Sequence, residues 1–291
     1  MCSSDLVRYA GLRSDHNFAL AYLEYSSLYH LMRGTGKRLW FLMDPLEDNL
    51  KRSQEDYKSH YEETLVASLL FPQVNAYEVM PWPERVFGHI PAPYATEIQS
   101  VIAALQEMHR QKELSGNAVE RDTIGVFVSD SMQWQREEPN KSDFDGLWGL
   151  TLPLLMHGIP VQIPSLDRAT SSDYLKPFKT LLLSYDYQKP LSAETHNVLA
   201  NWVRAGGSLV FFGGADPYSS VAEGWWQKKG YKAPQEDLWS QLGLRLGESK
   251  TRVAEQREDQ YSFVELDRAE EGEHDRSEEH TSELQSHSDL V

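Results

Sequence analysis

Hydrophobic residues in the first half of the chain recur at two spacings, which predict helices alternating with strands. From Asn17 to Met32 they recur at helical spacing, and the glycines that follow end this helix. The continuous apolar run at 39–43 predicts a strand buried on both faces. The predicted elements of this half are helices at 17–32, 64–71 and 94–109 and strands at 39–43 and 76–80. Their alternation implies parallel strands joined by right-handed crossovers.

The same pattern starts again after a polar segment at 111–122, where we place the domain boundary. The predicted strands lie at 123–128, 160–163, 178–183 and 208–212, and the predicted helices at 145–157, 192–205 and 231–247. Four strands that alternate with helices predict a three-layer α/β sandwich of the flavodoxin-like kind.

The composition argues against some classes of binding partner. The 291 residues carry a formal net charge of −16, and 11% of them are aromatic, a share that supports a folded core. Because an acidic chain repels phosphate backbones, we expect no nucleic-acid partner. No apolar run reaches the roughly 18 residues of a membrane span, so we expect no membrane partner either.

The two ends of the sequence differ in character from the rest. Residues 276–287 (RSEEHTSELQSH) match the in-frame translation of a sequencing-library adapter, and residues 1–6 are similar to its opposite-strand reading. We interpret 1–6 and 276–291 as adapter-derived, expect the latter to be disordered, and leave both out of the fold prediction. The only cysteine, Cys2, lies in the first of these segments, so we expect no disulfide and no cysteine nucleophile or metal ligand. The sequence does not indicate a localisation.

Carboxylates and a tryptophan accompany the ends of the two strands predicted in the first half. Asp44 and Glu47 come after the first strand, and Glu78 lies within the second. Trp82 and Glu84 come just after the second strand. In parallel α/β folds ligands bind at the carboxyl ends of strands, and a carboxylate beside a tryptophan is typical of sugar sites. Capping of a helix and a surface ion pair are the alternative explanations for each carboxylate taken alone.

Four short segments of the sequence are similar to segments of a known protein family. They are RLWFLMDP at 38–45, AYEVMPWPER at 76–85, YDYQKP at 185–190 and WVRAGGSLV at 202–210. With the order of elements between them, they resemble the family 42 β-galactosidases and their relatives. In those enzymes a catalytic barrel is followed by a glutamine-amidotransferase-like domain that helps to assemble the oligomer.

The resemblance implies an α/β fold with two domains. Residues 7–112 would be the C-terminal part of a (β/α)8 barrel, and 118–262 an amidotransferase-like, flavodoxin-like three-layer sandwich. The function implied is that of a fragment of a glycoside hydrolase, inactive as truncated, whose parent is homo-oligomeric. The alternative is a non-catalytic carbohydrate-binding or oligomer-assembly module.

The same resemblance implies roles for the acidic residues. The nucleophile of the barrel would be Glu78 or Glu84, with Asp44 as the next candidate. Trp82 and Glu47 would bind the carbohydrate substrate. The general acid, expected on an earlier strand, has no counterpart in this sequence, and neither a cofactor nor a metal ion is implied.

The second domain is predicted to be non-catalytic. Catalytic amidotransferases place a cysteine on a strained turn after a strand, served by a histidine. The turn after 181–183 reads SYDY and holds no cysteine. Ser184 with His196 is a conceivable pair, but a structural role for each residue is the simpler interpretation. The sequence GTGK at 34–37 lacks the spacing of a phosphate-binding loop and is interpreted as a helix stop.

Overall fold

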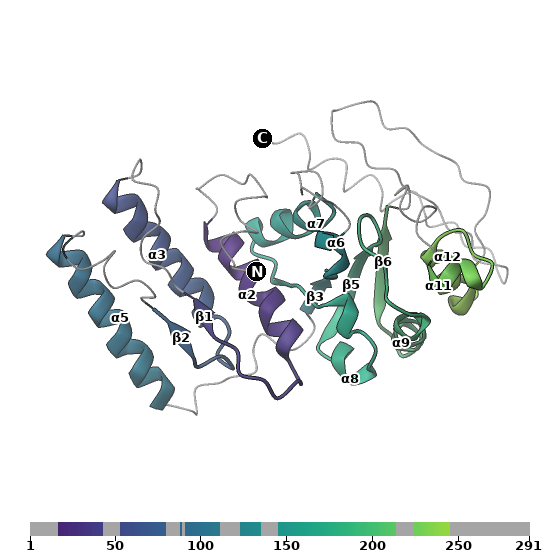
Figure 1. Cartoon of the computed structure of the whole chain (residues 1–291), viewed down its shortest axis with the longest axis horizontal. Coiled ribbons are helices and arrows are strands. Elements are labelled where there is room, and N and C mark those ends of the chain that lie inside the picture. Colours follow the sequence, from purple (N-terminus) through teal and green to yellow (C-terminus); the bar gives the residue numbers. More distant parts are fainter. Residues whose placement is uncertain are drawn as a thin grey trace.

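The chain folds into alternating helices and strands with two parallel sheets (Figure 1). The computed structural model describes residues 17–42, 53–79, 88, 91–110, 123–134, 145–213 and 224–244. The predicted α/β class is confirmed, and the predicted ends at 1–6 and 276–291 and boundary at 111–122 lie outside the described part.

The first half contains a two-stranded parallel sheet with helices packed against it. Its elements are α2 (Asn17–Met32), β1 (Phe41–Leu42), α3 (Gln54–Leu69), β2 (Tyr77–Glu78) and α5 (Ala92–Arg110). Their order and type are as predicted. In the sheet, Phe41 pairs with Tyr77 and Leu42 with Glu78. Helix α3 begins ten residues before the predicted start, because its polar first half includes Tyr61, which is buried against α5.

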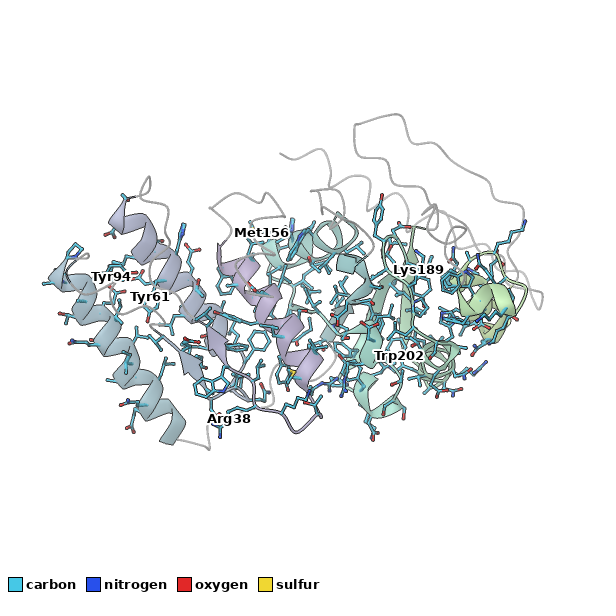
Figure 2. The ribbon with its side chains drawn as sticks, viewed as in Figure 1. Arg38, Tyr61, Tyr94, Met156, Lys189 and Trp202 are labelled. Atoms are coloured by element: carbon cyan, nitrogen blue, oxygen red, sulfur yellow. The ribbon has the colours of Figure 1, made fainter. Side chains whose placement is uncertain are left out.

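A small aromatic core joins α3 to α5. The rings of Tyr61 and Tyr94 lie 6.3 Å apart, between the two helices (Figure 2). Ile98 and Leu105 complete this buried cluster on α5. Tyr77 and Val79, on and just after β2, pack against it. The cluster therefore fixes which face of β2 points toward the helices.

The second half is built on a four-stranded parallel sheet in the order β4-β3-β5-β6. The strands are β3 (Thr123–Val126), β4 (Val161–Gln162), β5 (Phe178–Ser184) and β6 (Ser208–Phe212). All four were predicted, and β6 has the predicted bounds. Because the chain passes from β3 to one neighbour, β4, and then to the other neighbour, β5, the order reverses between β3 and β5.

Helices cover both faces of this sheet. The longer ones are α7 (Asp145–Met156), α9 (Ala193–Arg204) and α12 (Pro234–Leu242). The short ones are α6 (Ser131–Trp134), the 3-10 turn η4 (Leu166–Arg168), α8 (Ser172–Leu175) and α11 (Trp225–Lys228). On β5, Leu181 and Leu183 pack with α9 and α12, whereas Leu182 packs with the core on the other face. This alternation explains why the strand reads as a continuous apolar run.

Helix α2 lies between the two sheets (Figure 1) and packs against α3, α7 and β4. One hydrophobic cluster joins its Leu20 and Leu23 to Phe41 of β1 and to Val161 and Ile163 at β4. Ser26 strengthens the contact, because its Oγ accepts a hydrogen bond of 2.9 Å from the backbone N–H of Ile163. The core of α2 is thus shared by both halves of the chain.

None of the helices in the described part of the chain has the length and apolar character needed to cross a bilayer.

Candidate functional site

Glu78 is the predicted site residue that the structure describes. It ends strand β2, and its side chain is exposed. Tyr77 and Val79, on either side of it, pack against the cluster between α3 and α5. Since successive side chains of a strand point to opposite faces, Glu78 points away from these helices, on the face that it shares with Leu42.

The other predicted residues of this site are Asp44, Glu47, Trp82 and Glu84. All four lie outside the described residues. Asp44 follows β1 by two positions and Trp82 follows β2 by four. Their predicted roles therefore stay predictions.

The carboxyl edge of the four-stranded sheet carries a second group of polar side chains, drawn from the ends of neighbouring strands. Ser129 follows β3, Asp167 lies in η4 after β4, and Gln188 follows β5. They meet where the strand order reverses, which is the usual ligand position in open α/β sheets.

The side chains of this group form hydrogen bonds with one another and with the neighbouring backbone. The Ser129 hydroxyl donates to the two carboxylate oxygens of Asp167 at 2.9 and 3.0 Å, and the Asp130 N–H donates to the same carboxylate at 2.9 Å. The Ser129 N–H donates to Gln188 Oε1 at 2.7 Å. Gln188 Nε2 in turn donates to the carbonyls of Phe127 and Ser184. These bonds tie the strand ends together and leave Asp167 and Gln188 satisfied by the protein itself.

Asp130 is the exposed acid at this edge. Partial burial, and then the charge of Asp167, raise the pKa of Asp130 above its usual value. Beside it, the Ser129 hydroxyl is in hydrogen-bond contact with the Asp167 carboxylate. The hydrogen bonds of this group hold the strand ends in place.

The turn after β5 is the place where an amidotransferase would carry its nucleophile. Ser184 Oγ accepts a 3.1 Å hydrogen bond from the N–H of Asp186. Tyr187 adopts a φ of 58°, a conformation that non-glycine residues rarely take and that often accompanies functional turns. His196 does not contact Ser184 but bonds Tyr185, so the conceivable pair of Ser184 and His196 is not formed.

His196 belongs instead to a buried chain of hydrogen bonds that the sequence did not reveal. The Tyr185 hydroxyl donates to His196 Nε2 at 2.7 Å, and His196 Nδ1 donates to Asp237 Oδ2 at 2.8 Å. Lys229 Nζ and Gln241 Nε2 donate to the same carboxylate at 2.9 and 2.8 Å. This tautomer follows from Asp237, which only accepts when ionised.

Burial sets the protonation of this network. Burial lowers the pKa of His196, and this effect exceeds that of the hydrogen bond and charge of Asp237, which act to raise it. Burial also raises the pKa of Tyr185 well above its usual value. Burial also acts to raise the pKa of Asp237, but the hydrogen bonds from Lys229, His196 and Gln241 outweigh it and bring that pKa below the usual value. The network connects the residue after β5 and the residue after α11 to α9 and α12. Tyr185 and His196 are at most 1% exposed, whereas the Lys229 side chain is partly exposed.

Acidic, histidine and cysteine side chains do not gather in threes anywhere in the described residues, so no metal-binding group is found there. No protein-family model matches the chain, and no curated protein or solved structure is significantly similar to it. Its function must therefore be argued from its own residues.

Proposed function

We propose that this chain is part of a β-galactosidase-like glycoside hydrolase that cleaves O-glycosidic bonds, with Glu78 as the nucleophile. The observation that carries the proposal is the direction of Glu78. Tyr77 and Val79 pack on the helices, and the carboxylate between them faces the opposite side and is exposed. In a (β/α)8 barrel the helices lie outside, so a side chain that points away from them faces the barrel axis.

The arrangement of the first half supports the barrel assignment. Two parallel strands, each followed by a helix, form the repeating unit of such a barrel. Glu78 stands at the end of its strand, the end at which barrel enzymes carry their active sites. Trp82 and Glu84 follow within six residues of Glu78 and are proposed to line the same mouth together with Asp44 and Glu47.

The second half supports a flavodoxin-like, class I amidotransferase-like domain without catalysis of its own. Its strand order β4-β3-β5-β6 corresponds to 2-1-3-4 in order of appearance, the order of the first four flavodoxin strands. Ser184, the last residue of β5, accepts a hydrogen bond from the turn that follows, and His196 is bonded to Tyr185 and Asp237. We assign this domain to assembly of a homo-oligomeric parent enzyme.

The chemistry needs two carboxyl groups. Glu78 would attack the anomeric carbon of a galactoside while a carboxylic acid on an earlier strand protonates the leaving oxygen. The resulting glycosyl ester would then be hydrolysed by water, with the second residue acting as base. The 291-residue chain is proposed to be inactive alone, since the acid partner would come from elsewhere in the parent enzyme.

The test is to recover the longer reading frame that contains this sequence and to assay hydrolysis of an aryl β-galactoside. Glu78→Gln should lower turnover by about three orders of magnitude or more while folding and sugar binding persist. Glu55→Gln, which changes an exposed glutamate of α3, is the matched control and should keep normal turnover. Near-normal turnover in Glu78→Gln would contradict the assignment and move it to Glu84 or Asp44.

A second candidate is a non-catalytic carbohydrate-binding or oligomer-assembly module. It is favoured by β6, the last strand of the described sheet, whose Val210 is 41% exposed. A protein from the longer reading frame that forms an oligomer but hydrolyses no glycoside would support this second candidate over the first.

A further inference from the structure

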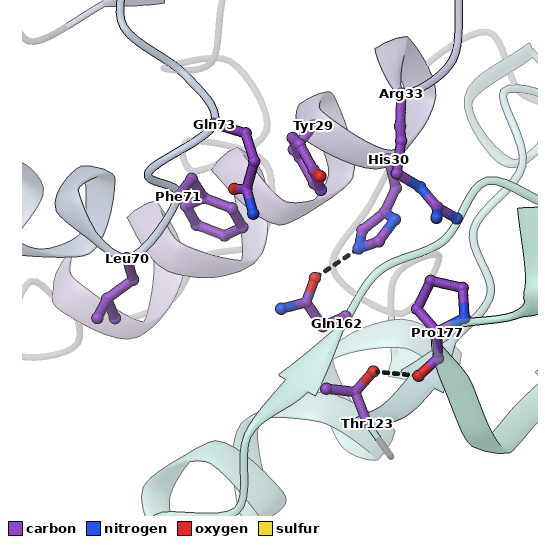
Figure 3. A pocket seen from close by; sticks show the side chains of 9 residues that line it. All are labelled: Tyr29, His30, Arg33, Leu70, Phe71, Gln73, Thr123, Gln162 and Pro177. Atoms are coloured by element: carbon purple, nitrogen blue, oxygen red, sulfur yellow. Dashed lines mark hydrogen bonds between the residues drawn. The ribbon is translucent and has the colours of Figure 1, made fainter. Parts of the chain in front are cut away.

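A small cavity lies where the end of α2 meets the starts of β3 and β5 (Figure 3). His30 of α2 and Arg33, just after its end, line one side, and Thr123, Gln162 and Pro177 line the other. The space admits about one water-sized group. This inner cavity does not involve Glu78 or the carboxyl edge of the four-stranded sheet.

Two residues that line the inner cavity, His30 and Arg33, each carry a buried polar atom without a hydrogen-bond partner in the described part of the protein, Nδ1 and Nε respectively. His30 Nε2 lies 2.5 Å from Gln162 Oε1, and Gln162 Nε2 donates to the Tyr22 hydroxyl at 3.4 Å. Because Gln162 Oε1 only accepts, His30 Nε2 carries the proton and Nδ1 is a free acceptor. Burial lowers the pKa of His30 to about 3, so its ring is neutral near pH 7.

Arg33 supplies the free donor. Its Nη2 donates to the carbonyl of Tyr174, and its guanidinium lies 4.6 Å over the ring of the same residue. These contacts hold the side chain while Nε remains unbonded. The residues that carry this free acceptor and this free donor thus line one cavity, and a buried polar group without a partner lowers stability. A ligand that offers both a donor and an acceptor would recover that stability.

A wider groove adjoins the inner cavity and shares Tyr29, Arg33 and Gln73 with it. The space in this groove that water can reach is about 320 Å³. Lys37 and Arg38 are exposed along it, and no aspartate or glutamate is found among the described residues that line either space. In a chain with 44 acidic and 28 basic residues this is a local reversal of charge.

Residues 34–37 form a loop along this groove, and its backbone conformation is fixed by glycines and hydrogen bonds. Gly34 and Gly36 have φ values of 75° and 72°, which favour glycine. The Thr35 hydroxyl donates to the carbonyl of Met32 at 2.7 Å and accepts from the N–H of Lys37 at 3.2 Å. The helix stop at 34–37 therefore also presents cations at the groove.

We propose that the inner cavity and the groove together bind a small phosphate monoester that carries hydroxyl groups, such as a polyol or sugar phosphate. A hydroxyl enters the inner cavity and donates to His30 Nδ1. The same hydroxyl accepts from Arg33 Nε, and the phosphate lies in the groove beside Lys37 and Arg38, near the positive charge of Arg33. Three cations match a group of two negative charges better than they match a carboxylate, and the free acceptor requires a hydroxyl rather than a bare anion.

Isothermal titration of the 291-residue chain tests the proposal with a matched pair of probes. Glycerol 3-phosphate carries the hydroxyls, and propyl phosphate has the same length without them. The first should bind about tenfold more tightly, which corresponds to about 1.4 kcal/mol. Equal binding of the two probes, or no binding of glycerol 3-phosphate at millimolar concentration, would overturn the proposal.

A pair of double variants tests the role of the groove. Lys37→Gln/Arg38→Gln should weaken binding of glycerol 3-phosphate about tenfold or more, because both cations beside the phosphate are lost. Lys228→Gln/Lys232→Gln removes the same charge from exposed positions near α11 and α12 and should leave binding unchanged. Equal weakening by both double variants would show a general charge effect and would contradict the site.

Discussion

At the scale of single residues, Asp237 is the acceptor on which three side chains converge. His196, Lys229 and Gln241 all donate to its carboxylate, which is almost fully buried at the start of α12. A carboxylate in this position keeps its charge because each neighbouring donor stabilises the ionised form. The network is therefore expected to contribute to stability and not to catalysis.

Replacing Asp237 by Asn should lower the free energy of unfolding by about 1 to 3 kcal/mol, because buried donors lose a charged acceptor. Urea unfolding followed by tryptophan fluorescence measures this change. Asp173→Asn is the control, since Asp173 forms a fully exposed ion pair with Lys176 and its loss should leave the midpoint within error. Equal effects of the two substitutions would contradict the structural role of Asp237.

His30 gives a prediction for pH. Burial holds the pKa of folded His30 at about 3, whereas an unfolded histidine has a pKa near its ordinary value of about 6.5. Below about pH 6.5 the unfolded chain gains a proton that the folded chain does not, so stability falls as the pH falls, by up to about 1.4 kcal/mol per pH unit. This decrease in stability should continue until the pH reaches the pKa of folded His30, about 3.

The measurement for His30 is the difference in unfolding free energy between pH 6.5 and 4.5, in the original chain and in His30→Gln. The variant should lose about 2 kcal/mol less over this interval. His157→Gln, which changes an exposed histidine just after α7, is the control for replacing a histidine elsewhere in the chain. A variant slope equal to the original slope would argue against a buried neutral His30.

At the scale of elements, the close approach of β3 to its neighbour depends on a glycine. A Cβ at Gly125 would come 2.7 Å from Leu181 Cδ2 and 2.8 Å from Phe178 Cδ1. Both side chains belong to the core against α9 and α12 and have little room to move. Gly125 therefore allows the β5 side chains to pack across β3.

Gly125→Ala should destabilise the chain by about 1 to 3 kcal/mol, the usual effect of overpacking a core. Thermal unfolding measured by circular dichroism would report it as a lower Tm. Ser208→Ala, on the exposed start of β6, tests whether any alanine in the sheet has this effect and should change Tm little. An unchanged Tm in Gly125→Ala would mean that the two strands are not packed as described.

The helices and strands also show which element bounds can be predicted from sequence patterns. Helix α9 was predicted to within one residue at each end, because Ser192 caps it and its apolar face is regular. Strands β1 and β2 are shorter than their apolar runs, since pairing and not hydrophobicity decides where a strand ends. The short elements α6, η4, α8 and α11 were not predicted, because three or four residues cannot display a helical period.

The candidate sites were predictable only in part. Glu78 stood out as a carboxylate within an apolar strand, but its direction depends on how Tyr77 and Val79 pack against α3 and α5. The partners Asp237 and Lys229 come from elements far along the chain, and no local pattern joins them to His196. Long-range contacts of this kind depend on the sheet order, which periodicity does not specify.

At the scale of the whole molecule, α2 makes the two halves share one core. Leu23 is fully buried in the cluster that includes Phe41 of the first sheet and Val161 of the second. We therefore expect the described parts to unfold together, with circular dichroism and tryptophan fluorescence giving coincident urea transitions. Two separated transitions would show that the halves are independent.

Leu23→Ala provides a sharper form of this prediction. Truncation of a fully buried leucine should cost about 2 to 5 kcal/mol, and both spectroscopic transitions should shift by the same amount. The exposed Val66→Ala on α3 is the control and should shift neither transition appreciably. A shift of one transition without the other would contradict a shared core.

The most direct test of the proposed function is to trap the glycosyl intermediate on the protein from the longer reading frame. A slowly released 2-fluoro galactoside should form an ester with the nucleophile, and mass spectrometry of the digested protein locates it. Glu78 points away from α3 and α5 and is exposed, so the label is expected on the peptide that contains it and should be absent from Glu78→Gln. A label on any other residue, or steady hydrolysis by Glu78→Gln, would contradict the assignment of Glu78 as the nucleophile.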